Sequence, residues 1–515
     1  IYTFEKLLAK TVKSIIIKIG IKFGFSFTIW RKWRPNMKIS TQLSARDRIF
    51  SLLDDNSFVE IGALVTRRST DFNLSQQELP ADGVITGYGV IDGNLVYVYC
   101  QDHSILNGTV GEMHAKKISH IYDLALKVGA PVIGIIDCAG LRLQEATDAL
   151  HGFGEIYYKQ AMASGFIPQI TAVVGTCGGG LSVLTSLSDF CFISKNHGKL
   201  FINSPNVVKG NYTEKCDTAD ASYQAEAGTV DFVCEDDETV FEKIRELITI
   251  LPSNSEDDAS YDECTDDLNR LVPNFKEEVK DTRLALQDIS DNNYFLEVKA
   301  DYAKEMVTGF IRLNGMTIGA IANRTEVVDE DGKVKETFDG SLTTAGCNKA
   351  EKFVKICDAY NIPILTFTNV TGYKATMEEE KTIGAASAKL TYAFANATVP
   401  KVNAIIGKAY GTAYITMNSK HIGADLVFAI EGVQIGMMDA KLAANIMYSD
   451  TKDITLLEEK AAEYASLQAS AEAAAKRGYV DSIIPAESMR KHLIYAYEML
   501  FTKQEGRPNK KHGTI

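Results

Sequence analysis

Residues 167–181 read IPQITAVVGTCGGGL, and residues 399–414 read VPKVNAIIGKAYGTAY. Each stretch is a run of apolar and β-branched residues, typical of a buried strand, that ends at a glycine cluster where a helical pattern begins. Three pairs of residues agree at a constant spacing of 232: Pro168 with Pro400, Gly175 with Gly407, and Gly179 with Gly411. This constant spacing predicts an internal duplication.

The match continues on both sides of these stretches. APVIGIIDCAGLRLQE (130–145) aligns with IPILTFTNVTGYKATMEE (362–379), which adds two more pairs at the same spacing: Pro131 with Pro363, and Gly140 with Gly372. Upstream, residues 87–99 match residues 309–321 at a spacing of 222, and downstream AGTVDFV (227–233) matches RGYVDSI at a spacing of 250. The spacing changes only outside the central block, as loop insertions would produce.

The two halves are expected to be separate domains. Pro252 and Pro273 bracket SNSEDDASYDECTDDLNRLV, an acidic stretch that cannot form its own core. We therefore predict domains at residues 37–251 and 274–515, joined by an acidic linker at 252–273.

Residues 1–36 differ from the remainder of the chain. Lys18 and Lys22 interrupt the apolar run Ser14–Trp30, which argues against a membrane span. The segment is basic and poor in acidic residues, so an organelle transit peptide and a peripheral amphipathic helix both stay open. We expect an N-terminal extension outside the folded core.

The periodicity within the first half alternates between strand and helix. Asp92-Gly93 lies between ITGYGVI and NLVYVY, the signal of a β-hairpin. A helical pattern follows at 112–127, then a buried strand at 131–137, a helix through 157–163 and a strand at 170–175. This alternation predicts an α/β fold.

Composition narrows the possible functions. The chain of 515 residues has a net charge of −13, which disfavours binding to nucleic acid. Its nine cysteines include no C-x-x-C pair, which argues against a disulfide framework or a zinc ribbon. We expect a reduced, cytoplasmic location and no metal in this chain.

The two glycine clusters are the main candidate sites. Glycine lets a ligand approach the backbone, and two convergent N–H groups at a helix start can form an oxyanion hole. Close packing of helix on strand is the alternative. Neither cluster has the G-x-G-x-x-G spacing of a dinucleotide site. The candidate residues are Gly178, Gly179 and Gly180 in the first half, and Gly411, Thr412 and Ala413 in the second.

Other polar residues give weaker signals. Arg142 follows Gly140 in a strand-end loop, where it is a candidate contact for a CoA phosphate or an ordinary surface residue. Cys177 has no neighbouring histidine and is expected to pack in the core. Four histidines lack metal-type spacing and are expected to be structural or solvated: His103, His114, His120 and His151.

Many segments, in order, resemble the biotin-dependent acyl-CoA carboxyltransferases. This family includes propionyl-CoA carboxylase β subunits and the α subunits of methylmalonyl-CoA and glutaconyl-CoA decarboxylases. The segments are ADGVITGYGVIDGNLVYVY, GEMHAKKI, GLRLQEATDALHGFGEI, QAEAGTVDFV, FVKICDAYNIPI, KAYGTAY, GADLVFAI and RPNKKHG. The resemblance covers nearly everything after Met37.

The resemblance implies a fold of two tandem crotonase-like (ClpP/crotonase) domains of repeated β-β-α units. The first domain would bind acyl-CoA and the second biotin. Gly179 and Gly180 would hold the thioester oxygen, and Thr412 and Ala413 the ureido oxygen of biotin. Other residues implied at the ligands are Gly140, Arg142, Gly178, Gly372, Gly411 and Ile415. For Ile415, lining the acyl pocket and packing in the core remain equal alternatives.

The resemblance also implies partners. Biotin would arrive on a separate biotin carboxyl carrier protein, with a biotin carboxylase or a sodium-pumping membrane decarboxylase subunit as a further partner. The chain would form a homohexamer, a trimer of dimers, free in the cytoplasm or peripheral to a membrane complex. Propionyl/methylmalonyl-CoA and acetyl/malonyl-CoA are the expected substrates. A glutaconyl-CoA decarboxylase, a crotonase-like hydratase, isomerase or hydrolase, and a non-catalytic scaffold are the alternatives.

Overall fold

The computed structural model describes residues 43–68, 81–209, 217–257 and 261–507. It divides the chain into two compact units, Ile1–Ser44 and Ala45–Ile515. All the helices and strands described belong to the second unit, and the predicted extension at residues 1–36 lies outside the described residues. Within the described ranges, no helix is both long enough and apolar enough to cross a membrane.

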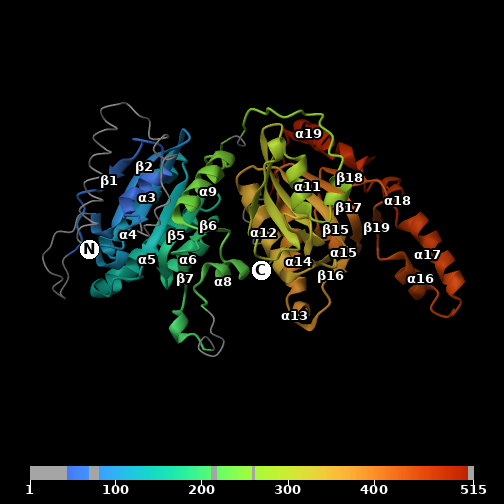
Figure 1. The fold of residues 1–515 in the computed structure, drawn as a ribbon, viewed down its shortest axis with the longest axis horizontal. Helices are drawn as coiled ribbons and strands as arrows, with labels where there is room; N and C mark the ends of the chain where they lie inside the picture. Colours follow the sequence, from blue (N-terminus) through green and yellow to red (C-terminus); the bar gives the residue numbers. More distant parts are fainter. Residues whose placement is uncertain (1–42, 69–80, 210–216, 258–260, 508–515) are drawn as a thin grey trace. The chain divides into compact units, whose positions relative to one another are not determined.

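Two eight-stranded sheets dominate the fold, one in each half of the chain (Figure 1). The first has the order β1-β2-β3-β4-β5-β6-β8, with β7 paired to β5. Its strands are β1 (Val59–Ile61), β2 (Val84–Ile91), β3 (Asn94–Gln101), β4 (Val132–Cys138), β5 (Gln169–Gly178), β6 (Phe190–Ser194), β7 (Lys199–Phe201) and β8 (Phe232–Cys234).

The second sheet repeats this topology strand for strand. Its order is β9-β10-β11-β15-β17-β18-β20, with β19 paired to β17. Its strands are β9 (Leu296–Val298), β10 (Met306–Leu313), β11 (Met316–Asn323), β15 (Ile364–Val370), β17 (Lys401–Tyr410), β18 (Leu426–Ile430), β19 (Gln434–Gly436) and β20 (Ser482–Ile484). Small pairs β12 (Glu326–Val328) with β13 (Val334–Thr337), and β14 (Ser341–Leu342) with β16 (Gly372–Tyr373), lie beside it.

Each sheet opens with an antiparallel hairpin and continues in parallel. The predicted turn at Asp92-Gly93 is confirmed. Both residues have positive φ, 47° and 84°, which a two-residue turn needs to match the right-handed twist of the strands it joins. Asn314-Gly315 takes the same conformation in the second half, with φ of 51° and 77°. The duplication is therefore present in the turns as well as in the strands.

Helices connect the parallel strands. In the first half they are α3 (Ala45–Leu52), α4 (Glu112–Val128), α5 (Ala146–Ala163), α6 (Gly180–Ser186), α8 (Ala221–Glu226) and α9 (Asp237–Ile250). In the second half they are α10 (Phe275–Glu278), α11 (Thr282–Ile289), α12 (Thr344–Ala359), α13 (Met377–Glu380), α14 (Ile383–Asn396), α15 (Gly411–Thr416), α16 (Ala440–Met447), α17 (Ile454–Gln468), α18 (Ala471–Ala475) and α19 (Met489–Leu500).

Helix α4 shows why these segments are helical. Its apolar residues recur at helical spacing, so that Ile118, Ile121 and Ala125 face the core with no exposed surface. The helix ends where Gly129 takes the left-handed conformation, and the Gly129 N–H donates to the Ala125 carbonyl. The predicted helix at 112–127 is thus confirmed, one residue longer.

The two halves contact each other through a buried polar group. The hydroxyl of Tyr360, at the end of α12, donates to the carbonyl of Ile167 at 2.9 Å and to Asp189 Oδ2 at 2.7 Å. Lys299 Nζ of the second half lies 3.2 Å from Asp231 Oδ1 of the first. Between the halves, no regular helix or strand occurs in the described residues from the end of α9 to the start of α10.

Candidate functional site

The same glycine turn ends β5 and β17. Gly179 and Gly411 both have φ of +62°, a conformation that side chains with a Cβ rarely adopt. A Cβ added to Gly179 would meet no atom within 4 Å, whereas one added to Gly411 would lie 3.2 Å from the Met437 carbonyl oxygen. The space in front of Gly179 is therefore open to a ligand.

A side chain from the neighbouring strand fixes the end of each of these strands. The Thr176 N–H donates to Asp137 Oδ1 at 3.3 Å, and the Lys408 N–H donates to Asn369 Oδ1 at 2.9 Å. Gly175 lies so close to Asp137 that a Cβ there would be 2.0 Å from Oδ1. The glycine before each turn is thus required by packing.

The structure corrects the expected set of amide donors. The Gly179 N–H already donates to the Phe201 carbonyl at 2.9 Å, so this amide holds β7 to the end of β5. The spacing of 232 pairs Thr412 with Gly180, and Ala413 with Leu181. Amides in the first turn of a helix have no acceptor in a preceding turn. Gly180 and Leu181 are thus the equivalents of the second candidate pair, and Leu181 was missed in the sequence.

Gly178 packs closely against an aromatic ring of the neighbouring strand. It pairs with Phe201 of β7, and an added Cβ would lie 2.8 Å from the Phe201 ring. In the second half the large and small residues are exchanged. Tyr410 has on β17 the position that Gly178 has on β5, and its partner on β19 is Gly436. The Phe201 ring fills the space beside the Gly178 α-carbon, and a contact between the Gly178 backbone and a ligand stays a prediction.

Gly140 lies in the loop after β4, and Gly372 has the equivalent position after β15, as the first residue of β16. Both have positive φ, 114° and 151°. An added Cβ would meet only the Gly178 carbonyl, at 3.8 Å, in the case of Gly140 and nothing within 4 Å in the case of Gly372. The Gly140 loop thus lies at the end of β5, beside the glycine turn, and both glycines have room in front of them.

Arg142 does not face a ligand. Its side chain is fully buried, with Nη1 donating to Asp82 Oδ1 at 2.7 Å and to Glu145 Oε1 at 2.8 Å, and Nη2 donating to the Thr109 carbonyl at 2.8 Å. Both terminal nitrogens of the guanidinium are occupied by these internal partners, so the expected contact with a CoA phosphate is contradicted. Burial lowers the pKa of the neighbouring His114 to about 3, so this histidine is a neutral structural residue.

Tyr157 reaches the first glycine turn from α5. Its half-buried hydroxyl donates to the Gly180 carbonyl at 2.5 Å. In the second half a polar group lies one helical turn after Thr412: Thr416 Oγ1 is 3.3 Å from the Tyr373 hydroxyl and 3.1 Å from Thr391 Oγ1. Ile415 is half-buried on α15, so its place in the acyl pocket stays a prediction.

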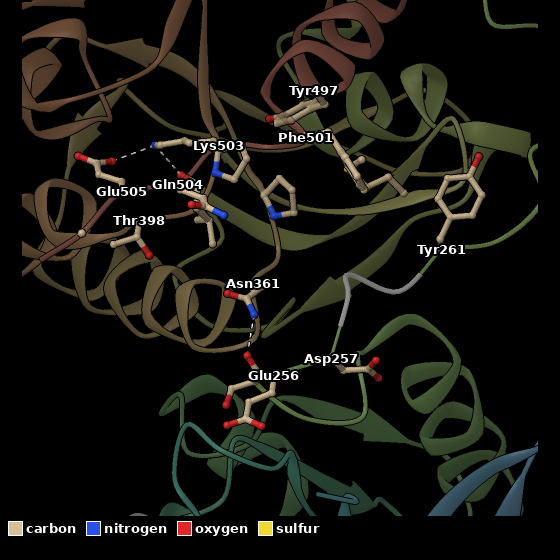
Figure 2. A pocket seen from close by; sticks show the side chains of 16 residues that line it. Glu256, Asp257, Tyr261, Asn361, Thr398, Tyr497, Phe501, Lys503, Gln504 and Glu505 are labelled. Atoms are coloured by element: carbon tan, nitrogen blue, oxygen red, sulfur yellow. Dashed lines mark hydrogen bonds and ion pairs between the residues drawn. The ribbon is translucent and has the colours of Figure 1, made fainter.

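A cavity of about 1020 Å³ lies elsewhere, where Pro363 and Pro400 precede β15 and β17 (Figure 2). Figure 2 shows Asn361, Lys503 and Glu505 in its wall, and Lys503 is paired with Glu505. None of the candidate residues lines this cavity. Among the described residues, no group of three His, Cys, Asp or Glu side chains is placed to hold a metal ion.

Comparisons with known proteins all give one family. The carboxyl transferase domain matches residues 40–515. The α subunit of methylmalonyl-CoA decarboxylase from Propionigenium modestum is 38% identical over 494 residues, covering 92% of this chain and 93% of that one. The propionyl-CoA carboxylase β chain of Roseobacter denitrificans is 37% identical over 487 residues, covering 92% and 94%.

A solved structure agrees with these relatives. The transcarboxylase 12S hexamer, with hydrolysed methylmalonyl-CoA bound, superposes with a TM-score of 0.86 at 34% identity, covering 92% of each chain. The family match over residues 40–515 includes both glycine turns.

Proposed function

The chain belongs to the carboxyl transferase family and is a biotin-dependent acyl-CoA carboxyltransferase, and from this premise we propose that its halves bind different substrates. The first half takes a short acyl-CoA, propionyl/methylmalonyl or acetyl/malonyl, and the second takes biotin. The observation that carries the presence of two sites is the repeated strand, glycine turn and pair of amides at the ends of β5 and β17, and the assignment of acyl-CoA to the first half follows the family resemblance.

The first site stabilises charge on the thioester oxygen. Removing a carboxyl group or a proton from the α-carbon leaves an enolate, whose negative charge lies largely on that oxygen. The N–H groups of Gly180 and Leu181 donate to it, and Gly179 leaves the approach open. A well-placed donor of this kind is typically worth about 10²–10³ in rate.

The second site serves the ureido oxygen of biotin. When bound, biotin supplies the ring nitrogen that gives or takes the carboxyl group. The amides of Thr412 and Ala413 donate to the ureido oxygen, and the Gly411 turn orients them. Biotin reaches this site on a biotin carboxyl carrier protein, working with a biotin carboxylase or a sodium-pumping membrane subunit.

A second copy of the chain completes the site. Helix α16 exposes Leu442 and Ile446, and the first half exposes Leu143, after the Gly140 loop, and Val207, between β7 and α8. Apolar side chains exposed in groups mark interaction surfaces. The first half of one copy therefore faces the second half of another, and three such dimers form a hexamer in the cytoplasm.

Gly179→Val tests the first site. With free biotin as acceptor, the wild-type protein should remove the carboxyl group from methylmalonyl-CoA or malonyl-CoA. The variant should lose at least about 10²-fold in kcat/KM, because the side chain blocks the amides. Gly332→Val is the matched control, since Gly332 also has positive φ (76°) and open space but lies in the β12–β13 turn.

Two results would contradict the proposal. A folded wild-type protein that carboxylates or decarboxylates no acyl-CoA, glutaconyl-CoA included, would refute the activity. Equal activity of the Gly179 and Gly332 variants would refute the placement of the acyl-CoA site.

A further inference from the structure

Tyr157 contacts the peptide that forms the first candidate site. Its hydroxyl donates to the Gly180 carbonyl at 2.5 Å, and this carbonyl belongs to the same peptide unit as the Leu181 N–H. The tyrosine ring is held in turn by Phe153, in an edge-to-face contact with ring centroids 5.8 Å apart. One turn further along both helices, Gln160 Nε2 donates to the Leu184 carbonyl at 3.1 Å. Helix α5 therefore fixes α6 at two points.

These contacts also explain the glycine at position 180. A Cβ there would lie 2.8 Å from the Tyr157 hydroxyl oxygen and 3.0 Å from the nearest Phe153 ring atom. Both separations are shorter than ordinary van der Waals contact, so any larger residue displaces the tyrosine. Gly180 and Tyr157 thus depend on each other.

The second half lacks this arrangement. The spacing of 232 places Ala385 and Lys389 at the positions of Phe153 and Tyr157, and Thr412 at the position of Gly180. An alanine and a lysine on α14 replace the aromatic pair, and a threonine at the turn replaces the glycine. The hydroxyl-to-carbonyl bond is therefore a feature of the first site alone.

We propose that Tyr157 is a positioning residue for carboxyl transfer, which holds the Gly180–Leu181 peptide so that its N–H points at the thioester oxygen. This inference rests on the function proposed for the first half. A hydrogen bond to the carbonyl of a peptide polarises its N–H, and so strengthens the donor at the moment when charge develops on the substrate. The role is exerted through the peptide, without contact between Tyr157 and the reacting atoms.

Tyr157→Phe tests this role in the full-length protein with methylmalonyl-CoA and free biotin. We expect kcat to fall by about 3- to 10-fold, the range for one lost hydrogen bond, with the KM values for both substrates nearly unchanged. Tyr158→Phe, the exposed neighbour on the same helix, is the control and should keep wild-type kinetics. Infrared spectra of bound propionyl-CoA labelled with ¹³C at the thioester carbonyl give a second readout. The carbonyl band should lie at lower frequency in wild type than in Tyr157→Phe.

The partner residue gives a double-mutant cycle. Gly180→Ala pushes the tyrosine hydroxyl away, so it should impair kcat, and adding Tyr157→Phe should cost less than about a further twofold. The proposal would be overturned if the losses in kcat caused by Gly180→Ala and Tyr157→Phe multiplied in the double variant. It would also be overturned if Tyr157→Phe kept the wild-type kcat or left the carbonyl band unshifted. Failure of the wild-type protein to transfer carboxyl groups would instead refute the proposed function, since the infrared comparison needs no turnover.

Discussion

Single residues show how the duplicated sites diverged while keeping their geometry. Asp137 and Asn369 occupy equivalent positions, and each accepts a backbone N–H at the end of the next strand. Asp137 is also paired with Arg48, with Nη1 at 3.0 Å from Oδ2 and both side chains buried. The end of the next strand thus needs only an oxygen acceptor, whereas the second carboxylate oxygen of Asp137 pairs with Arg48.

This difference predicts the effect of Asp137→Asn. The amide keeps the bond to the Thr176 N–H, as Asn369 does for Lys408, but Arg48 loses its closest carboxylate. Asp237 remains 3.8 Å from Nη2. We expect the free energy of unfolding, measured by urea titration, to fall by about 2–4 kcal/mol.

A second substitution separates charge from packing. Adding Arg48→Met to Asp137→Asn should recover part of the loss, because no guanidinium stays buried without its closest carboxylate, and Asp237 keeps His197 Nδ1 at 3.1 Å. If the double variant loses more free energy of unfolding than the two single variants lose together, this account is contradicted.

At the scale of elements, α16 and α17 form a pair whose surface is unusually apolar. The two helices pack on each other (Figure 1). Ile446 is 58% exposed and Met447 61%, both on α16, and Ile454 at the start of α17 is 71% exposed. Burying such side chains against a second copy would stabilise the assembly by about 1.5–3 kcal/mol for each fully covered residue.

Ile446→Glu should therefore weaken self-association. A charge inside an apolar contact is costly, so we expect the dissociation constant of the oligomer, measured by analytical ultracentrifugation, to rise by about tenfold or more. Asn445→Glu, on the adjacent polar position, should weaken it less. If the two variants assemble equally well, α16 lies outside the interface.

Much at this scale was predictable from the sequence, and the failures have identifiable causes. The hairpin, the α4 helix and the strands before both glycine turns follow from local periodicity and turn chemistry. Arg142 could not be placed, because its partner Asp82 is 60 residues away and only folding brings them together. Leu181 could have been found by applying the spacing of 232 to Ala413. Tyr157 gives no local signal.

At the scale of the whole molecule, the predicted α/β fold of two crotonase-like units is confirmed, as is membership of the carboxyltransferase family. The boundaries predicted for the domains and the linker remain predictions. What the sequence did not indicate is the contact between the halves. Tyr360 of the second half meets the half-buried Asp189 of the first, and Lys299 meets the buried Asp231.

That contact makes stability depend on pH. Burial raises the pKa of Asp189 to about 6 from its ordinary value of 3.8, against hydrogen bonds from Tyr360 and the Gln169 N–H that lower it. The folded state thus keeps a proton on Asp189 that the unfolded chain releases above about pH 4. The stabilisation from this group is full below pH 4 and is lost as the pH rises through 6.

Asp189→Asn should remove this dependence, because the amide stays neutral. The free energy of unfolding of wild type, relative to the variant, should fall by about 1–3 kcal/mol between pH 4 and pH 7.5, as measured by urea titrations. A difference between the two proteins that stays constant over this range would contradict the assignment.

At the strand ends, Phe201 pairs with Gly178 in the first half, and Gly436 pairs with Tyr410 in the second. This exchange of large and small residues bears on how a chain with two similar halves avoids misassembly. During synthesis, an edge strand from one repeat can compete for the partner of the other. Here β19 next to β5 would leave a void between two glycines, and β7 next to β17 would force two aromatic rings together. Each repeat therefore rejects the other's strand, which protects the nascent chain from intramolecular swapping.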